Sequence, residues 1–206
     1  MKPILFNTAM VRAILDGRKT VTRRVIKFPE DMTGRLPESG ATDYLYYPCG
    51  IKYPPYKKGD ILYVRETWAI PYGKGYYYAA DYHSEFDVLP ADNGDVSVSK
   101  NCIRWHPSIH MPKEAARLFL HVTDVRVERL REMTVSDLQN EGELPGGYIS
   151  QYATMTFECF DQFKALWDST IKPADIPRYG WDANPWVWVI EFERCEKPEE
   201  DVKCEA

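Results

Sequence analysis

Six basic residues gather in the segment from residue 12 to residue 27, which includes the stretch ILDGRKTVTRRVIK. With one acid, Asp16, the segment has a charge of six minus one, +5, whereas the whole chain carries −5, so the remainder carries −10. Positive side chains stabilise an oxyanion in a reaction or hold a phosphate, and an acidic remainder keeps long polyanions away. We therefore predict that the segment is the floor of a small pocket, with Arg18 and Lys19 at the turn after Gly17.

A second group of residues has the spacing of metal ligands. Cys102, His106 and His110 lie four positions apart, which would place them on one face of a helix. Pro107 and Pro112 make a helix there unfavourable, and no further ligand cluster follows. We therefore predict neither a metal nor any other cofactor.

Two further segments contain candidates for binding a planar base. Aromatic residues form 14% of the chain, and such rings fill cores as well as line pockets. In the proline-broken stretch RWHPSIHMP the candidates, which are either pocket residues or structural ones, are Trp105, Ser108 and His110. In the strand of GDILYVRETW they are Arg65, Glu66 and Trp68. Alternation along a strand places Arg65 on the opposite face from the other two.

The hydrophobic pattern predicts several strands and few helices. Strands are expected at PILFN, at TVTRRVI, after the turn Gly59-Asp60, over residues 117–129 and at WVWVIEFERC. Helices are expected at AMVRAILD with Thr8 as its N-cap, at TVSDLQNEG with Thr134 as its N-cap, and at TFECFDQFKALWDST. This order is not a βαβ alternation and favours an α+β fold with a mixed, barrel-like sheet and helices at its ends.

Two segments are predicted to be long loop insertions in a single domain over residues 1–195. Residues 28–58 contain five prolines, and residues 83–101 contain PADNGD. A chain of 206 residues fits one domain with insertions of this kind. The acidic segment 196–206 is expected to be a disordered tail.

Cysteine spacing and hydropathy predict a cytoplasmic protein with no membrane partner. The five cysteines are widely spaced and form no CxxC motif, which is typical of a reduced compartment. The longest apolar run, near WVWVI, is far shorter than the about 20 residues that cross a bilayer. The segment MKPILFNTAM lacks the pattern of a signal peptide.

Five blocks together resemble the ASCH domain, a member of the PUA-like superfamily. In chain order they are ILDGRKTVTRR, GDILYVRETW, FLHVTDVRVERL, LQNEG and VWVIEFER. Their order and spacing resemble that family over most of the chain, and GRKTxTRR is the most specific part. The stretches ADY and WHPSIHMPKEAAR resemble longer members, often carried by phages or prophages. The resemblance implies a small β-barrel with flanking helices.

The resemblance also implies two classes of function. Small bacterial members are amidohydrolases that remove the acyl group from N4-acetylcytidine and related acylated cytosines, whereas others are RNA-binding modules and some are ribonucleases. In the amidohydrolases the catalytic set is a Lys in the GRKT block, a Thr three residues later and a Glu at the end of the short helix. These correspond here to Lys19, Thr22 and Glu141. The expectation is a metal-independent hydrolase of a nucleoside or base; the alternative is a module that binds RNA or a modified nucleotide, with ribonuclease activity as a variant.

Amide hydrolysis needs a nucleophile, a base and donors to the developing oxyanion. Thr22 can act as the nucleophile if a partly neutral Lys19 takes its proton, and Glu141 either orients Lys19 or activates water itself. A covalent acyl-threonine and direct attack by water both remain open. Because positions 19 and 22 of a regular strand face opposite sides, their convergence requires an irregular backbone over residues 18–21.

Two other arginines of the basic segment are expected to face outward. Adjacent strand residues point to opposite faces, so one of Arg23 and Arg24 is predicted to lie at the surface, together with Arg12. Substitution of Arg12 by alanine is then expected to change little.

Overall fold

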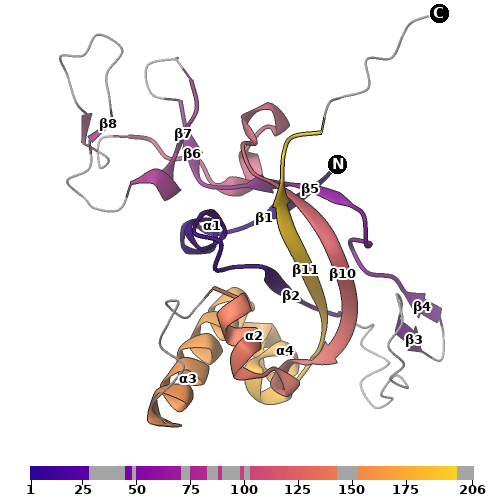
Figure 1. The fold of residues 1–206 in the computed structure, drawn as a ribbon. Helices are drawn as coiled ribbons and strands as arrows, with labels where there is room; N and C mark the ends of the chain where they lie inside the picture. The colour runs from indigo at the N-terminus through magenta and orange to yellow at the C-terminus, as the bar shows by residue number, and fades with distance from the viewer. Residues whose placement is uncertain are drawn as a thin grey trace, which may run out of the picture. The chain divides into compact units, whose positions relative to one another are not determined.

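The computed structural model describes residues 1–27, 45–47, 50–70, 75–82, 88–89, 98–99, 103–142 and 153–198 (Figure 1). Its strands are β1 (Lys2–Leu5), β2 (Val21–Val25), β3 (Leu45–Tyr47), β4 (Gly50–Lys52), β5 (Ile61–Arg65), β6 (Trp68–Ala69), β7 (Tyr77–Tyr78), β8 (Val88–Leu89), β9 (Val98–Ser99), β10 (Phe119–Arg129) and β11 (Trp186–Cys195). Its helices are α1 (Thr8–Leu15), α2 (Val135–Asn140), α3 (Ala153–Thr170) and α4 (Ile176–Tyr179). The positions predicted for the long strands and for three helices are confirmed.

Five strands form one mixed sheet in the order β1-β5-β10-β11-β2. β1 runs parallel to β5, with Ile4 opposite Val64, whereas β10 is antiparallel to β5 and β2 is antiparallel to β11. Three two-stranded sheets pair β3 with β4, β6 with β7 and β8 with β9. The α+β class is confirmed. Within the described part of the chain no sheet closes into a barrel, so the PUA-like barrel stays a prediction.

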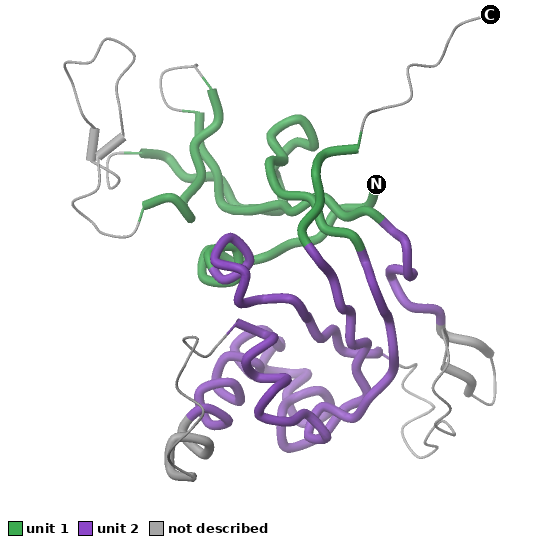
Figure 2. The backbone as a smooth tube through the Cα atoms, in the orientation of Figure 1, with its two compact units in different colours: residues 1–12, 61–121, 194–206 green, residues 13–60, 122–193 purple. Residues whose placement is uncertain are grey.

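The chain divides into two compact units that alternate along the sequence (Figure 2). The first unit contains residues 1–12, 61–121 and 194–206, and the second contains residues 13–60 and 122–193. The single domain predicted over residues 1–195 stays a prediction.

The predicted insertions are described only in part. β3 and β4 form an antiparallel pair within residues 28–58, and β8 and β9 form another within residues 83–101. The rest of these segments, apart from residues 53–58, and the predicted tail after residue 198 lie outside the described residues. Among the described residues, no helix has the length and apolar character needed to cross a membrane.

The first unit buries one side of β5. Leu62 and Val64 are buried while Arg65 stays half-buried, and Glu66 continues the buried side beyond the strand. The predicted alternation is thereby confirmed.

The N-terminal helix begins one residue earlier than the expected cap. The side-chain oxygen of Asn7 accepts a hydrogen bond of 2.8 Å from the backbone N–H of Met10, and Thr8 is already helical. Asn7 therefore caps α1, because its carbonyl-bearing side chain satisfies a donor of the first turn. The prediction of Thr8 as N-cap is wrong by one position.

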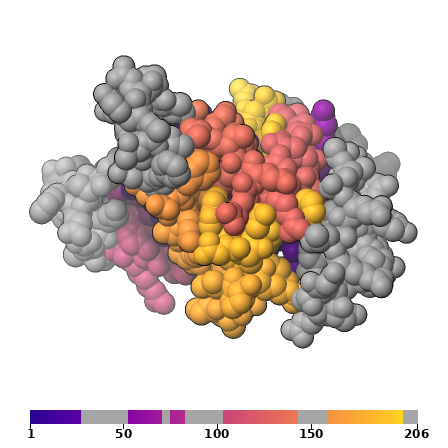
Figure 3. Space-filling view, turned by 90° about the horizontal axis from the view of Figure 1, so that it is seen from below, coloured from indigo at the N-terminus to yellow at the C-terminus, as the bar shows by residue number. Residues whose placement is uncertain are grey.

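The core of the second unit lies between one face of β2 and β11 and the helices α2 and α3 (Figure 1). The buried side chains that form it are Val21, Leu130, Met133, Leu138, Phe163, Trp167, Val187 and Val189. Burial of a large apolar side chain stabilises a fold by about 1.5–3 kcal/mol, so this cluster holds α2 against β2. α3, α4 and the turn Trp181–Ala183 also pack together, and the space-filling view shows these segments side by side (Figure 3).

Candidate functional site

The turn between α1 and β2 has an irregular backbone before β2 begins. Gly17 has a φ of 74°, in the left-handed region that ends helices. The backbone N–H groups of Arg18 and Lys19 both donate to the carbonyl oxygen of Ala13, at 2.8 and 3.0 Å. Lys19 then forms an isolated β-bridge with Glu141, and β2 begins only at Val21. The irregular backbone expected over residues 18–21 is therefore present up to residue 20, whereas Val21 already belongs to the strand.

The C-terminal end of α2 places Glu141 next to this turn. The helix begins with a capping box in which Thr134 and Asp137 exchange hydrogen bonds, and Glu141 is its C-cap. Gly142 follows with a φ of 84° and lies against the turn. A Cβ atom at Gly142 would be 2.7 Å from the Cβ of Ala13, so only glycine permits this approach.

Lys19 and Glu141 form a buried ion pair. Nζ of Lys19 lies 2.6 Å from Oε2 of Glu141, and the exposed fractions of the two side chains are 0% and 5%. Nζ also donates to the carbonyl oxygens of Val21 and Glu141, at 2.7 and 3.1 Å. An ammonium has three N–H donors and no acceptor, and each donor has an acceptor here. In this arrangement the Glu141 carboxylate can accept a proton as a general base, whereas the Lys19 ammonium can only donate hydrogen bonds.

Arg23 binds the second oxygen of the same carboxylate. Its Nη1 donates to Oε1 of Glu141 at 3.1 Å, and its Nη2 lies 3.0 Å from Asp137 and 3.4 Å from Glu128. Arg23 is 3% exposed. Its participation was missed by sequence reasoning, although alternation from the apolar Val21 places it on the same face of β2.

Thr22 occupies the opposite face of β2. Within the β2–β11 ladder it pairs with Ile190, whereas Arg23 pairs with Val189. Since neighbouring strand residues point to opposite faces, Thr22 faces away from the side on which Arg23 meets Glu141. Thr22 is 2% exposed. The structure thus joins two of the three expected catalytic residues by direct contact and places the third on the other face of the strand.

Two further cations of the basic segment, Arg18 and Lys27, pair with acidic side chains of the chain. Arg18 binds the carboxylate of Asp16 at 2.9 Å and donates to the carbonyl oxygen of Gly142 at 2.6 Å. Lys27 lies 3.5 Å from Asp175. The corner that is basic in sequence is therefore largely neutralised in the folded chain.

Arg12 corrects one expectation. It donates to the carbonyl oxygens of Ala79, Ala80 and Tyr82, and it is half-buried. These bonds hold the short 3-10 turn Ala79–Asp81 within the first unit. The prediction of an outward-facing Arg12 is wrong, because the backbone of a distant turn supplies acceptors that the local sequence does not reveal.

The predicted base-binding residues lie in the first unit, and most of them contact other residues of that unit. Arg65 donates to the carbonyl oxygen of Met111 at 2.8 Å. Trp68 pairs through its backbone with His106, and their rings are 5.0 Å apart. Trp105 lies near Tyr82 with ring centroids 6.1 Å apart. Ser108 and His110 fall in a 3-10 turn that contains no buried residue.

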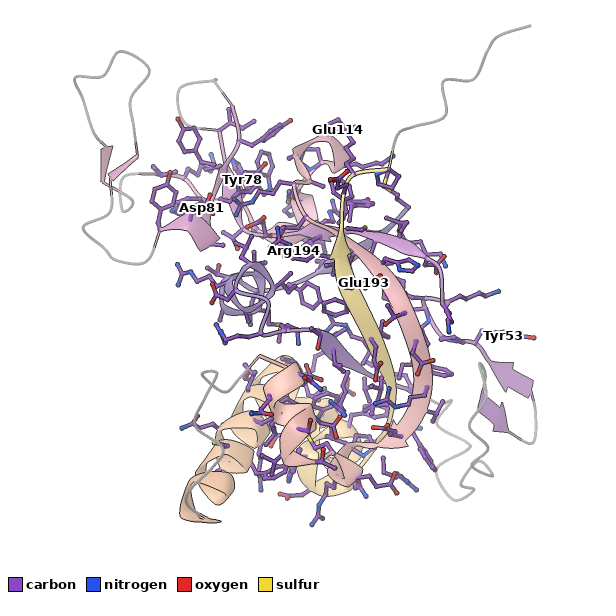
Figure 4. The ribbon with its side chains drawn as sticks, viewed as in Figure 1. Tyr53, Tyr78, Asp81, Glu114, Glu193 and Arg194 are labelled. Carbon is purple, nitrogen blue, oxygen red and sulfur yellow. The ribbon has the colours of Figure 1, made fainter. Side chains whose placement is uncertain are left out.

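Glu66 is the most buried of these candidates, at 1% exposed. Arg117 binds both of its oxygens, at 2.9 and 3.1 Å, and also binds Asp81. The guanidinium of Arg117 stacks on the ring of Tyr78 at 3.9 Å, and Tyr78 and Asp81 lie close together after β6 (Figure 4). Burial raises the pKa of Glu66, and the hydrogen bond and charge of Arg117 oppose that effect.

The described residues offer no group of three His, Cys, Asp or Glu side chains that could hold a metal ion. Of the three residues with ligand spacing, Cys102 lies outside the described residues. His106 instead packs its ring on Trp68.

Comparisons with known proteins do not assign this chain to a family. No protein-family model matches the sequence, and no curated protein is significantly similar to it. Among solved structures, the chain is similar to protein EF3133 from Enterococcus faecalis, assigned to the DUF984 family, at 10% identity and a TM-score of 0.35. The similarity covers 97% of this chain and 84% of that protein. At this level neither a fold nor a function is transferred.

Proposed function

We propose that this protein is a metal-independent amidohydrolase of the ASCH type, with a PUA-like barrel, that removes the acyl group from N4-acylcytosine nucleosides such as N4-acetylcytidine. A cytoplasmic setting is part of the proposal. The observation that supports it is the contact of Lys19 with Glu141. These residues are 122 positions apart in the sequence, yet they form a buried pair at 2.6 Å. They are also two of the three residues that the ASCH resemblance implies for catalysis.

Stability by itself is a poor reason for such a pair. Removing a lysine and a glutamate from water costs several kcal/mol for each ion, and apolar replacements of similar volume are often neutral or stabilising. A buried ion pair therefore favours a chemical role, because strongly perturbing environments concentrate at functional sites.

In the proposed reaction, Glu141 is the general base and Lys19 stabilises the oxyanion. Water adds to the acyl carbonyl carbon and passes its proton to the carboxylate of Glu141. The Lys19 ammonium exchanges one of its backbone carbonyl acceptors for the developing oxyanion and stabilises it. The C–N bond then breaks, the exocyclic nitrogen takes the proton and leaves as the amine of cytosine, and the acyl group is released as a carboxylic acid. A covalent route through Thr22 is not part of the proposal, because Thr22 faces away from Glu141 and is 2% exposed.

The ion pairs weigh against the alternative, a module that binds RNA or a modified nucleotide through phosphates. Two cations, Lys19 and Arg23, face three carboxylates, those of Glu128, Asp137 and Glu141. A phosphate contact needs a cation that is free to pair with the phosphate and to displace its counterions. If the alternative holds, affinity for single-stranded RNA should fall steeply with salt.

The test is hydrolysis of N4-acetylcytidine and a panel of N4-acylcytosines in the presence of a chelator. Wild type should release the free cytosine compound, and Lys19→Met and Glu141→Gln should each lower kcat by about 1,000-fold, the scale of removing one electrostatic catalytic group. Lys27→Ala is the matched control, because Lys27 is a lysine of the same segment with a 60% exposed side chain. Equal turnover by Lys19→Met and wild type would refute the site assignment.

A further inference from the structure

Arg23 connects three carboxylates that come from two separate elements. Glu141 and Asp137 belong to the C-terminal end and first turn of the α2 segment, and Glu128 belongs to β10. All of these contacts lie in the second unit. The guanidinium is almost fully buried, with 1% of its side chain exposed. Arg23 therefore does not reach solvent and meets only groups of this chain.

The contact with Arg23 fixes the plane of the Glu141 carboxylate. Lys19 binds one oxygen of that carboxylate, Oε2, and Arg23 binds the other, Oε1. With Lys19 as its only partner, the carboxylate could turn about its last side-chain bond and still keep one hydrogen bond, because terminal torsions of glutamate are broad. With both cations in place, any such rotation breaks one of two charge-assisted hydrogen bonds.

Arg23 is itself oriented for its carboxylates. Among the described residues, Nε of Arg23 is one of the few buried side-chain nitrogen or oxygen atoms without a hydrogen-bond partner. Buried donors are ordinarily paired. In the orientation in which its terminal nitrogens contact Glu141 and Asp137, the guanidinium therefore leaves its Nε–H without a hydrogen bond. Asp137 is held in turn by the capping box with Thr134.

We infer that Arg23 is a positioning residue for the reaction, which orients Glu141 so that one carboxylate oxygen stays on Lys19. The inference rests on the proposed function. It adds a residue outside the set of Lys19, Thr22 and Glu141. Arg23 acts through Glu141, so its loss should disturb the chemical step and leave substrate binding nearly intact.

The activity test uses Arg23→Ala and Arg23→Lys with Arg126→Ala as the matched control. Arg126 also binds Glu128, but its other partners are Asp124 and Glu191 and not Glu141. Arg23→Ala should lower kcat by about 100-fold, the cost of a misplaced catalytic group, with KM almost unchanged. Arg23→Lys should restore part of kcat, because lysine is a point charge and cannot bridge two carboxylates as a guanidinium does. A rise in KM at unchanged kcat would overturn the inference.

A second readout does not depend on turnover. The buried Lys19 ammonium should give a slowly exchanging Nζ–H signal in nitrogen-15 NMR, identified by its loss in Lys19→Met. That signal should shift or disappear in Arg23→Ala and Arg23→Lys, and persist in Arg126→Ala. An unchanged signal in both Arg23 variants would overturn the inference. If wild type hydrolyses no acylcytosine, the proposed function fails, and the NMR comparison still decides whether Arg23 orients the pair. If Arg23→Ala does not fold, the kcat and the signal of Arg23→Lys decide.

Discussion

Gly142 lies so close to Lys19 that a Cβ atom on the glycine would sit 3.0 Å from the Cβ of the lysine. The same Cβ would be 2.7 Å from the Cβ of Ala13. Both neighbours are buried, at 2% and 3% exposed, so neither can move aside without disturbing the turn. The end of α2 therefore reaches Lys19 only because residue 142 has no side chain.

Gly142→Ala is expected to destabilise the protein more than the same change at Gly59. Both glycines have a positive φ, 84° and 88°, and a left-handed alanine costs roughly 1–2 kcal/mol at either site. Only Gly142 adds a steric clash, since nothing lies within 4 Å of a Cβ at Gly59. Overpacking adds about 1–3 kcal/mol. Urea unfolding of both variants measures the difference, and equal losses would show that α2 does not dock as described.

Asp137 should make the stability of the second unit depend on pH in the acid range. Burial by itself would raise the pKa of Asp137, but hydrogen bonds from Thr134 and the contact with Arg23 outweigh it, so the pKa lies below its usual value. A lowered folded-state pKa stabilises the protein above the unfolded value, about 3.9, and this contribution is lost as the pH falls through the folded value.

Asp137→Asn should therefore lower the free energy of unfolding by about 1 kcal/mol at pH 7, the scale of a lost cap. The gap between wild type and variant should close as the pH falls below about 4, the unfolded value. Chemical denaturation at several pH values measures this gap, with the exposed Asp161→Asn as control. A gap that stays constant with pH would contradict the assignment of Asp137 as the titrating group.

Arg117→Met should leave Glu66 buried without its cation. Breaking a buried ion pair by removing one partner costs about 3–5 kcal/mol, and we expect about 3 kcal/mol here because the Arg117 side chain is 27% exposed. Burial already raises the pKa of Glu66 in the folded state, against the opposing effect of Arg117. A raised pKa of a carboxyl means that stability is lost as the pH rises from the unfolded value through the folded one. The variant should therefore be less impaired at pH 4 than at pH 7.

Arg126→Met is the matched control for Arg117→Met. Its side chain is 29% exposed, close to that of Arg117, but its carboxylate partners are 25–49% exposed, whereas Glu66 is 1% exposed. Exposed ion pairs contribute about 0–1 kcal/mol. Thermal unfolding at the two pH values compares the variants, and a similar loss in both would show that Glu66 is not held by Arg117.

The sequence alone determined most of the secondary-structure elements and named both residues of the ion pair, Lys19 and Glu141. Period-two alternation located β5, β10 and β11, and the N-cap residue Thr134 located the start of α2, because these signals depend on neighbours within one element. Lys19 and Glu141 were named through the motif that carries the resemblance. The turn at Gly17, which ends α1, was also a local prediction, since a left-handed glycine commonly ends a helix whatever lies around it.

Only the tertiary structure decided which charges meet. Arg23 turned inward to carboxylates 105 to 118 positions away, a choice between Arg23 and Arg24 that the sequence had left open. Arg12, which had been expected at the surface, bound carbonyl groups about seventy positions away. Gly142 proved necessary for a close approach as well as for its φ. Thr22 fell on the opposite face from the pair because β2 becomes regular at Val21. Such choices depend on which face of a strand a distant helix covers, and burial then forces each charged group to find a partner that no local pattern encodes.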